Sequence, residues 1–235
     1  MSEVDHRERL LRISRIVTAT ADGGDTAGSL CRASVEVMAV AGASTMLMSD
    51  GLPTPLCASD AVAARLEDLQ HTLGDGPCIE AHERGRGVFA PDLGAQVRSR
   101  WATFIPDAIA AGAAAVFSYP LRVGGVRLGA LTLYQREPGD LSAEQHADAR
   151  TLASVLTNAI LSIQARVAPG SLSPELELLA SDRAELHQAT GMVSVQLGVN
   201  VREALVRLRA YAYASEQPLI DVAREVVAGR LRLDE

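Results

Sequence analysis

Lysine is absent from the sequence, and all 22 basic residues among the 235 are arginine. The absence excludes a phosphate-binding loop of the GxxxxGKS or GxxxxGKT type, Schiff-base chemistry and the active-site lysine of a receiver domain. Aromatic residues are also scarce, at 3%. The 29 acidic residues outnumber the arginines and give a net charge of -7. A chain of this charge does not hold nucleic acid through its overall electrostatic field.

Cysteine is rare too, with only Cys31, Cys57 and Cys78. An odd count without a Cys-x-x-Cys pair predicts neither a disulfide framework nor a zinc knuckle. The longest uncharged runs, 108–121 and 151–165, have 14 and 15 residues, short of the roughly 18 that span a bilayer. We therefore expect a soluble protein of a reducing cytoplasm. No residues stand at metal-ligand spacing or form a catalytic constellation, so we expect neither a metal nor an enzyme.

Hydrophobic periodicity predicts a mixed α+β region followed by a purely helical one. Short apolar strands flank Asp50-Gly51 and longer ones flank Gly124-Gly125, which indicates two hairpins. Asp60 is a candidate helix cap, and a short helix opens after residues 73–78. The other helices expected in this region cover 5–20, 26–41, 60–71, 100–111 and 143–167.

A cluster of Pro, Gly and Ser at 167–174 marks a boundary, and Ser173 with Pro174 predicts a helix start. Two more helices follow, one capped by Asn200 with Glu203 and one starting at Pro218. We expect an N-terminal helix over 1–24, an α+β domain over 25–166, a linker over 167–173 and a three-helix module over 174–235.

The first helix of the module carries Leu176, Leu179, Leu186, Val193 and Leu197 at 3-4 spacing. This weak heptad fits either a two-helix coiled coil in a homodimer or packing within the module. A face of small residues around Gly191 fits either close helix packing or a nucleic-acid loop.

In the second helix, Arg202, Arg209 and Tyr213 lie opposite the arc expected to be buried, which comprises Ala204, Leu205, Leu208, Tyr211 and Ala212. This arrangement fits an arginine–tyrosine platform for nucleobases, or a tyrosine resting on arginine stems.

Three segments of the module resemble the ANTAR domain of bacterial RNA-binding antiterminators: HQATGM at 187–192, EALVRLRAYAY at 203–213 and LIDVAREVVAG at 219–229. The resemblance implies a three-helix, usually dimeric module that binds paired RNA hairpins and so prevents a transcription terminator from forming. Many members have Lys where this chain has Thr190. The RNA-binding residues that we expect from the resemblance and the helix faces are His187, Gln188, Ala189, Thr190, Gly191, Arg202, Arg209 and Tyr213.

The preceding region resembles a GAF domain, of the subtype often found ahead of ANTAR modules in actinobacteria. The matching pieces are LGDGPCIEA at 73–81, Trp101 with Phe104, and PLRVGGVRLGALTLY at 120–134. Relatives often have Trp-Pro where this chain has Trp101-Ala102. The resemblance implies an antiparallel sheet with flanking helices and a small-molecule pocket whose ligand or cofactor the sequence does not name. Candidate lining residues, which would otherwise be core, are Met46, Met48, Cys57, Cys78, Trp101 and Phe117.

Together these features predict a cytoplasmic, homodimeric sensor and effector: a GAF-like domain receives a signal and controls an ANTAR-like module that binds RNA. Two rival functions stay open from the sequence alone. One is a GAF-based thiol enzyme, such as a small-molecule sulfoxide reductase, using Cys57 and Cys78. The other is an adaptor whose helical tail binds a protein partner.

Overall fold

A five-stranded antiparallel sheet lies at the centre of the structure, a computed structural model that describes residues 3–20, 26–49, 52–96, 100–165 and 172–233. The strand order is β2-β1-β5-β4-β3. The two expected hairpins are present, although the first predicted turn, at 50–51, lies outside the described residues. The strands are β1 (Gly42–Ser49), β2 (Leu52–Ala58), β3 (Val88–Ala90), β4 (Ala115–Val123) and β5 (Val126–Gln135).

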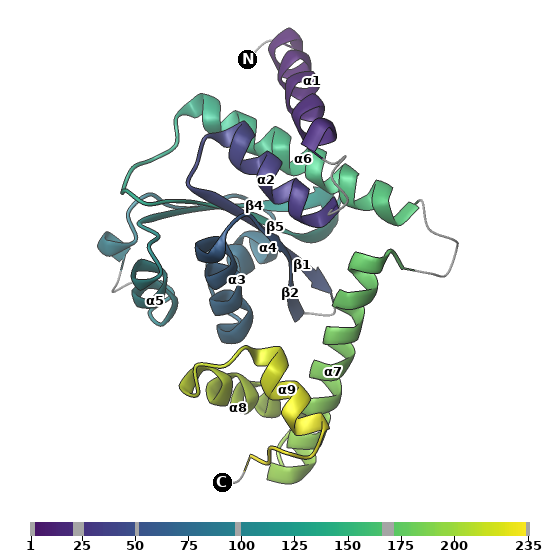
Figure 1. Cartoon of the computed structure of the whole chain (residues 1–235). Coiled ribbons are helices and arrows are strands. Elements are labelled where there is room, and N and C mark those ends of the chain that lie inside the picture. The colour runs from purple at the N-terminus through teal and green to yellow at the C-terminus, as the bar shows by residue number, and fades with distance from the viewer. Residues whose placement is uncertain (1–2, 21–25, 50–51, 97–99, 166–171, 234–235) are drawn as a thin grey trace.

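Helices cover both faces of this sheet (Figure 1). One face carries α2 (Thr26–Met38) and α6 (Ala143–Ala165), and α1 (Glu3–Thr20) packs on these two helices and projects away from the sheet. Successive side chains of a strand point to opposite faces, and Phe117, Tyr119 and Leu121 of β4 enter the core beneath these helices. The other face carries α3 (Ala61–Leu73), α4 (Pro77–Arg84) and α5 (Phe104–Ala110), with a second core that includes Met46, Leu66 and Phe104.

Local sequence signals set several helix ends. The Asp60 carboxylate accepts hydrogen bonds from the backbone N–H groups of Val62 and Ala63, as expected of an N-cap. Two predicted helices are shorter than expected, because α2 stops before Ala39 (φ 50°) and α5 starts after Trp101 (φ 49°). A left-handed residue cannot lie inside a right-handed helix.

A disulfide joins Cys31 of α2 to Cys57 of β2, so the prediction of no disulfide was wrong. The two cysteines are 26 residues apart in sequence, and they meet only because α2 packs against this end of the sheet. Cys78 is free and buried in the core of the opposite face. The sheet therefore separates Cys57 from Cys78, and the two do not face one another.

The C-terminal module consists of α7 (Pro174–Leu197), α8 (Val201–Ala214) and α9 (Leu219–Val227). Ser173 and Asn200 cap α7 and α8 through their side-chain oxygens. Leu186 and Val193 of the heptad are buried in the core of the module itself, so the structure shows internal packing where the spacing also allowed a free coiled-coil seam. Tyr211, expected in the buried arc of α8, is 37% exposed.

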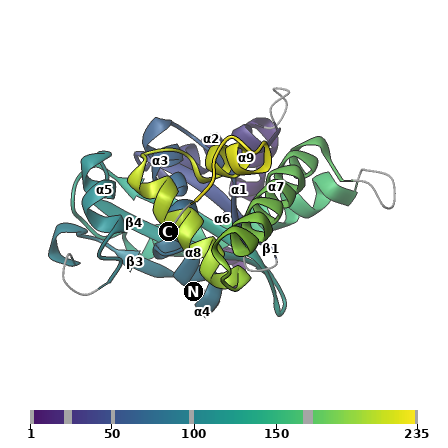
Figure 2. The same ribbon diagram turned by 90° about the horizontal axis from the view of Figure 1, so that it is seen from below.

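The module docks on the sheet domain below α3 and β2 (Figures 1 and 2). Leu52 of β2 is only 5% exposed because it packs into the apolar core of the module. The two parts of the chain thus share buried apolar surface. Within the described residues, no helix is long and apolar enough to cross a membrane.

We expect Asp60→Ala to lower the free energy of unfolding by about 1–2 kcal/mol, because two N-terminal N–H groups of α3 lose their acceptor. Chemical denaturation measures the change. Glu137→Ala, at an exposed position, is the matched control and should stay within about 0.5 kcal/mol of the parent. Equal stability of the two variants would contradict the capping role.

Candidate functional site

The polar stripe of α8 that the sequence assigns to RNA is divided between solvent and the sheet domain. Arg202 near the start of the helix is exposed, as is Val206 beside it at 53%. Arg209, one turn further along, is half-buried, and Tyr213 is 38% exposed. The C-terminal half of the stripe turns toward α3 and α5, because α3 packs directly on α8.

Arg209 lies against the C-terminal end of α3. A Cβ atom added to Gly74 would come within 2.1 Å of Nη1 of Arg209, so the guanidinium rests on this glycine. Gly74 ends α3 with φ 64°, a left-handed conformation that suits glycine. Nε of Arg209 is buried without a hydrogen-bond partner among the described residues, and burial lowers the pKa of the guanidinium. The interface therefore holds an incompletely satisfied positive charge.

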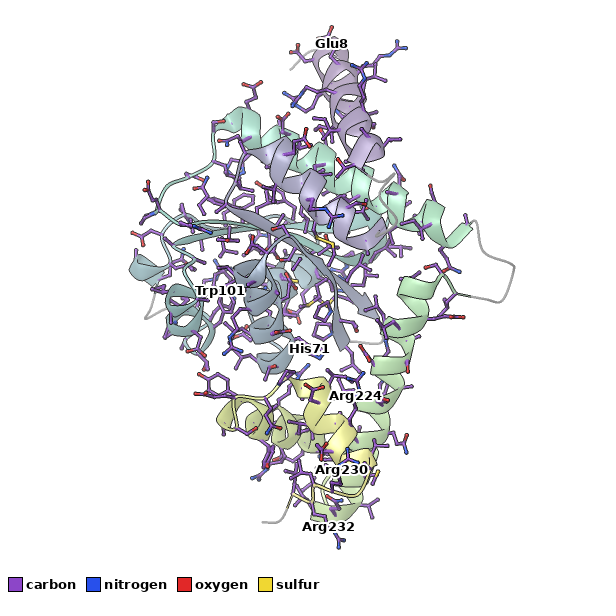
Figure 3. The ribbon with its side chains drawn as sticks, in the orientation of Figure 1. Glu8, His71, Trp101, Arg224, Arg230 and Arg232 are labelled. Atoms are coloured by element: carbon purple, nitrogen blue, oxygen red, sulfur yellow. A yellow bond between two sulfur atoms is a disulfide. The ribbon has the colours of Figure 1, made fainter. Side chains whose placement is uncertain are left out.

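His71, on the last turn of α3, shares this buried region (Figure 3). Its Nδ1 lies 2.5 Å from the carbonyl oxygen of Pro53, to which it donates in the neutral form. Burial is the main cause that lowers the pKa of His71 to about 4; the hydrogen bond to Pro53 opposes this shift, and the positive charge of Arg209 adds to it. His71 is accordingly neutral at pH 7.

Tyr213 makes the second contact of α8 with the sheet domain. A hydrogen bond with the side chain of Asp107, on α5, is the main cause that raises the pKa of its hydroxyl. Asp107 is held in place by α5, which packs against α3. Arg209 and Tyr213 thus touch two different helices of the sheet domain.

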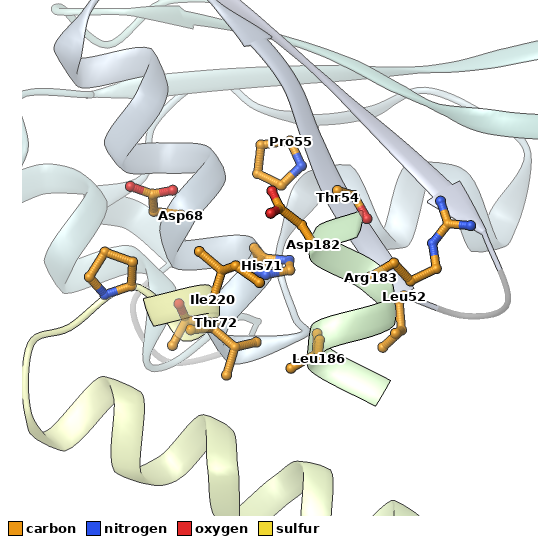
Figure 4. A pocket seen from close by; sticks show the side chains of 12 residues that line it. Leu52, Thr54, Pro55, Asp68, His71, Thr72, Asp182, Arg183, Leu186 and Ile220 are labelled. Atoms are coloured by element: carbon orange, nitrogen blue, oxygen red, sulfur yellow. The ribbon is translucent and has the colours of Figure 1, made fainter. Parts of the chain in front are cut away.

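A cavity of about 130 Å³ lies beside these contacts, between the two domains (Figure 4). The sheet domain contributes residues of β2 and α3, and the module contributes residues of α7 and the start of α9. The pKa of Asp68 is raised mainly by burial, with a smaller contribution from Asp221. The lining residues are Leu52, Thr54, Pro55, Asp68, His71, Thr72, Asp182, Arg183, Leu186, Pro218, Leu219 and Ile220.

The candidate RNA residues of α7 have unequal access. His187 and Gln188 are exposed, and a Cβ added to Gly191 would meet no atom within 4 Å. The small-residue face therefore stays open and is not used for internal helix packing. Ala189 and Thr190, two other expected RNA contacts, are buried, at 0% and 3% exposed.

The reason for this burial is that Ala189 and Thr190 lie on the arc of α7 that faces the other helices of the module. Thr190 also donates its hydroxyl to the carbonyl of Leu186. The threonine side chain is therefore occupied inside the module and does not reach the exposed surface.

Most other arginines of the module are engaged with acidic side chains. Arg207 pairs with Glu203 at 3.0 Å and Arg230 pairs with Glu225 at 2.8 Å. Arg224 binds Asp182 and Glu185, both at 2.8 Å (Figure 3). Arg202 and Arg209 are therefore the candidate cations of the α8 stripe for an RNA backbone.

The six candidate lining residues of the GAF-like pocket do not gather at one place. Met46, Cys78 and Trp101 belong to the core on the α3 face of the sheet, and Met48 packs against it. Phe117 belongs to the core on the opposite face, and Cys57 packs against that core. Within the described residues, no group of His, Cys, Asp and Glu has the arrangement of a metal site.

The sequence reasoning missed a polar group buried beneath α3. Ser44 donates to Oε1 of Glu67 at 2.5 Å, and Gln70 accepts from the backbone N–H of Cys78 at 2.7 Å. Oε2 of Glu67 and Nε2 of Gln70 have no partner among the described residues. Burial raises the pKa of Glu67 to about 7, against the hydrogen bond from Ser44. In a sequence, Glu and Gln within a helix are typical of a solvent-exposed face, so no pattern indicated that Glu67 and Gln70 are buried.

This arrangement defines a two-domain protein, with an α+β domain docked on a three-helix module. Family comparison agrees: the GAF domain family matches residues 20–161 and the ANTAR domain family matches residues 175–227. The chain belongs to the GAF domain family, and an ANTAR domain follows its GAF domain. The two domains together are those of a signal-sensing, RNA-binding antitermination regulator.

Solved structures show the same fold for the first domain. The GAF domain of a phosphoenolpyruvate-protein phosphotransferase from Coxiella burnetii is 19% identical, with a TM-score of 0.53, over 68% of this chain and 96% of that one. The corresponding Acinetobacter domain is 15% identical, with a TM-score of 0.52, over 72% and 99%. Free methionine-R-sulfoxide reductase from Neisseria meningitidis is 16% identical, with a TM-score of 0.50, over 69% and 92%. No curated protein matches the chain.

The depressed pKa of His71 predicts a loss of stability in acid. Between its ordinary pKa of 6.5 and the folded value of about 4, the unfolded chain binds a proton that the folded chain does not. Folding is therefore weakened as pH falls through this window, by about 2 kcal/mol between pH 7 and pH 5. His71→Gln keeps a donor for the carbonyl of Pro53. In urea denaturation, its free energy of unfolding should fall by about 2 kcal/mol less than that of the parent between pH 7 and pH 5. If the free energy of unfolding fell equally with pH in the parent and the variant, His71 would not be the cause of the acid sensitivity.

Proposed function

We propose that this protein is a non-enzymatic antitermination regulator whose GAF domain covers part of the RNA-binding face of its ANTAR domain and uncovers it on receiving a signal. The RNA targets are paired hairpins that overlap a terminator. One observation carries the proposal: Arg209 and Tyr213, the arginine–tyrosine pair of α8, both contact the GAF domain. A base or phosphate cannot occupy the space that α3 and α5 fill.

The energetics of the contact favour such an exchange. A buried donor without an acceptor costs about 1–3 kcal/mol, and Nε of Arg209 is in that position. An RNA phosphate offers a charge-assisted partner to the guanidinium. Apolar burial of Leu52 in the ANTAR core opposes undocking. The docked state, in which the GAF domain covers α8, and the RNA-bound state therefore compete for the same face of α8.

The open small-residue face of α7 supplies the other half of the RNA surface. His187 and Gln188 are exposed beside Gly191, where no described atom would meet an added side chain. A surface of small residues allows a nucleic-acid backbone to approach closely. The face stays available in the docked state, so docking weakens RNA binding without removing every contact.

The separation of Cys57 and Cys78 argues against the thiol-enzyme alternative. Cys57 is bonded to Cys31, and burial raises the pKa of Cys78 well above its usual value. A nucleophilic cysteine reacts as its thiolate, which this environment disfavours. The other alternative is an adaptor whose helical tail binds a protein partner. In that case Arg209 and Tyr213 would have no role beyond their contacts with the GAF domain.

Opening the domain interface should strengthen RNA binding. Leu52→Asp places a charge where Leu52 meets the ANTAR core, and we expect affinity for a two-hairpin RNA to rise about tenfold as the competent fraction grows. In that background, Arg209→Ala with Tyr213→Ala should lower affinity more than tenfold, since base stacking alone is worth about 1–3 kcal/mol per base.

Val126→Asp is the matched control for this experiment, because Val126 is 63% exposed on the other hairpin. It should bind RNA like the parent. If Leu52→Asp is folded and binds no better than this control, the GAF domain does not mask the RNA face. If the triple variant keeps the affinity of Leu52→Asp, the RNA face lies elsewhere on the module.

We expect the working unit to be a homodimer that presents two ANTAR modules to the two hairpins. Exposed leucines on α1 support this expectation: Leu10 is 37% and Leu11 57% exposed, beside α6. Light scattering should give twice the chain mass of 24.8 kDa. Leu11→Glu should shift the mass toward one chain, whereas Val123→Glu on the β4–β5 hairpin should not. A monomer for the parent at high concentration would refute the dimer.

A further inference from the structure

Three arginines converge on a second cavity, on the α6 side of the sheet and away from the domain interface. The cavity has a volume of about 300 Å³. Its arginines come from three separate elements: Arg86 from the turn after α4, Arg122 from β4 and Arg150 from α6. The remaining lining residues are Gly85, Gly87, Tyr119, Pro120, Ala153 and Ser154.

No lining residue of this cavity is acidic. Among the described residues, none of the three guanidinium groups has an ion pair or side-chain hydrogen bond, whereas seven other arginines pair with carboxylates. All three arginines are exposed, so the cavity presents three positive charges to solvent in a chain whose net charge is -7. A concave surface that gathers charge of one sign attracts ligands of the opposite sign.

Along β4, Tyr119, Pro120 and Arg122 line the cavity past Ser118, where the pairing of β4 with β3 ends. The register of the β4–β5 pair shifts between Leu121 and Arg122, and the extra residue of this bulge is Leu128 of β5. Gly85, with φ 62°, ends α4 and turns the chain so that Arg86 reaches the same cavity.

We infer that this cavity is a binding site for a small molecule that carries a diphosphate group. Guanidinium groups bind phosphate oxygens through paired, charge-assisted hydrogen bonds. Three guanidinium groups match the roughly three negative charges of a diphosphate near pH 7, whereas a carboxylate or sulfate leaves positive charge unbalanced. Because α6 forms one wall and lies directly before the ANTAR domain in sequence, the site is also a candidate input of the sensor. Binding itself does not depend on the RNA-binding role.

Calorimetric titration of the full chain with inorganic pyrophosphate, in a buffer free of divalent metals, tests the site. We expect one binding event per chain, weakened at least tenfold in Arg122→Gln/Arg150→Gln. Arg15→Gln, at an exposed position of α1 outside the cavity, is the matched control and should bind like the parent. Melting temperatures should stay close together, since the substituted side chains make no described hydrogen bonds.

Two results would overturn the inference: no pyrophosphate binding by the parent, or equal binding by the double variant. Sulfate binding as tight as pyrophosphate would overturn the assignment of a diphosphate. If the double variant loses RNA affinity while the parent ignores pyrophosphate, the arginines serve the RNA backbone and the inference is also wrong. The proposed masking of α8 is judged by Leu52→Asp alone, so failure of one proposal leaves the other standing.

Discussion

Burial of the Arg209 guanidinium against Gly74 is the interaction on which the relation between the two domains depends. Guanidinium stays charged at any physiological pH, so its partial desolvation, with no partner for Nε in the described part of the chain, opposes docking. Leu52 supplies the opposing apolar contact. In the mechanism proposed above, this interface covers α8 and gives way to an RNA phosphate. Under that proposal, RNA binding and domain docking are alternatives, and the signal shifts the balance between them.

Helix α3 links the sensory core to that interface. Glu67 and Gln70 project from it into the GAF core and retain unpartnered polar atoms there, while His71 and the Gly74 cap face the ANTAR domain. Interiors are packed tightly and transmit small shifts, so under the proposed mechanism we expect a change that reorders Glu67 or Gln70 to move the surface on which Arg209 rests. In that mechanism, α3 connects the sensory core to the RNA-binding face.

The sequence anticipated what depends on neighbouring residues: the hairpins, the Asp60 cap and the order of elements in both domains. It failed where tertiary contacts decide. The Cys31–Cys57 bond required the packing of α2 on the sheet, and the heptad of α7 could not reveal whether its partner was another chain or its own module. Arg209 and Tyr213 were rightly placed on a polar face, but periodicity cannot show that another domain covers it.

Hydrogen–deuterium exchange of α3, measured with and without a two-hairpin RNA, tests the competition between docking and RNA most directly. If RNA displaces the GAF domain from α8, amides in the last turns of α3, which end at Leu73, exchange faster in the complex, while α8 itself becomes protected. Unchanged or stronger protection of α3 at saturating RNA would show that RNA binds without undocking and would contradict the account.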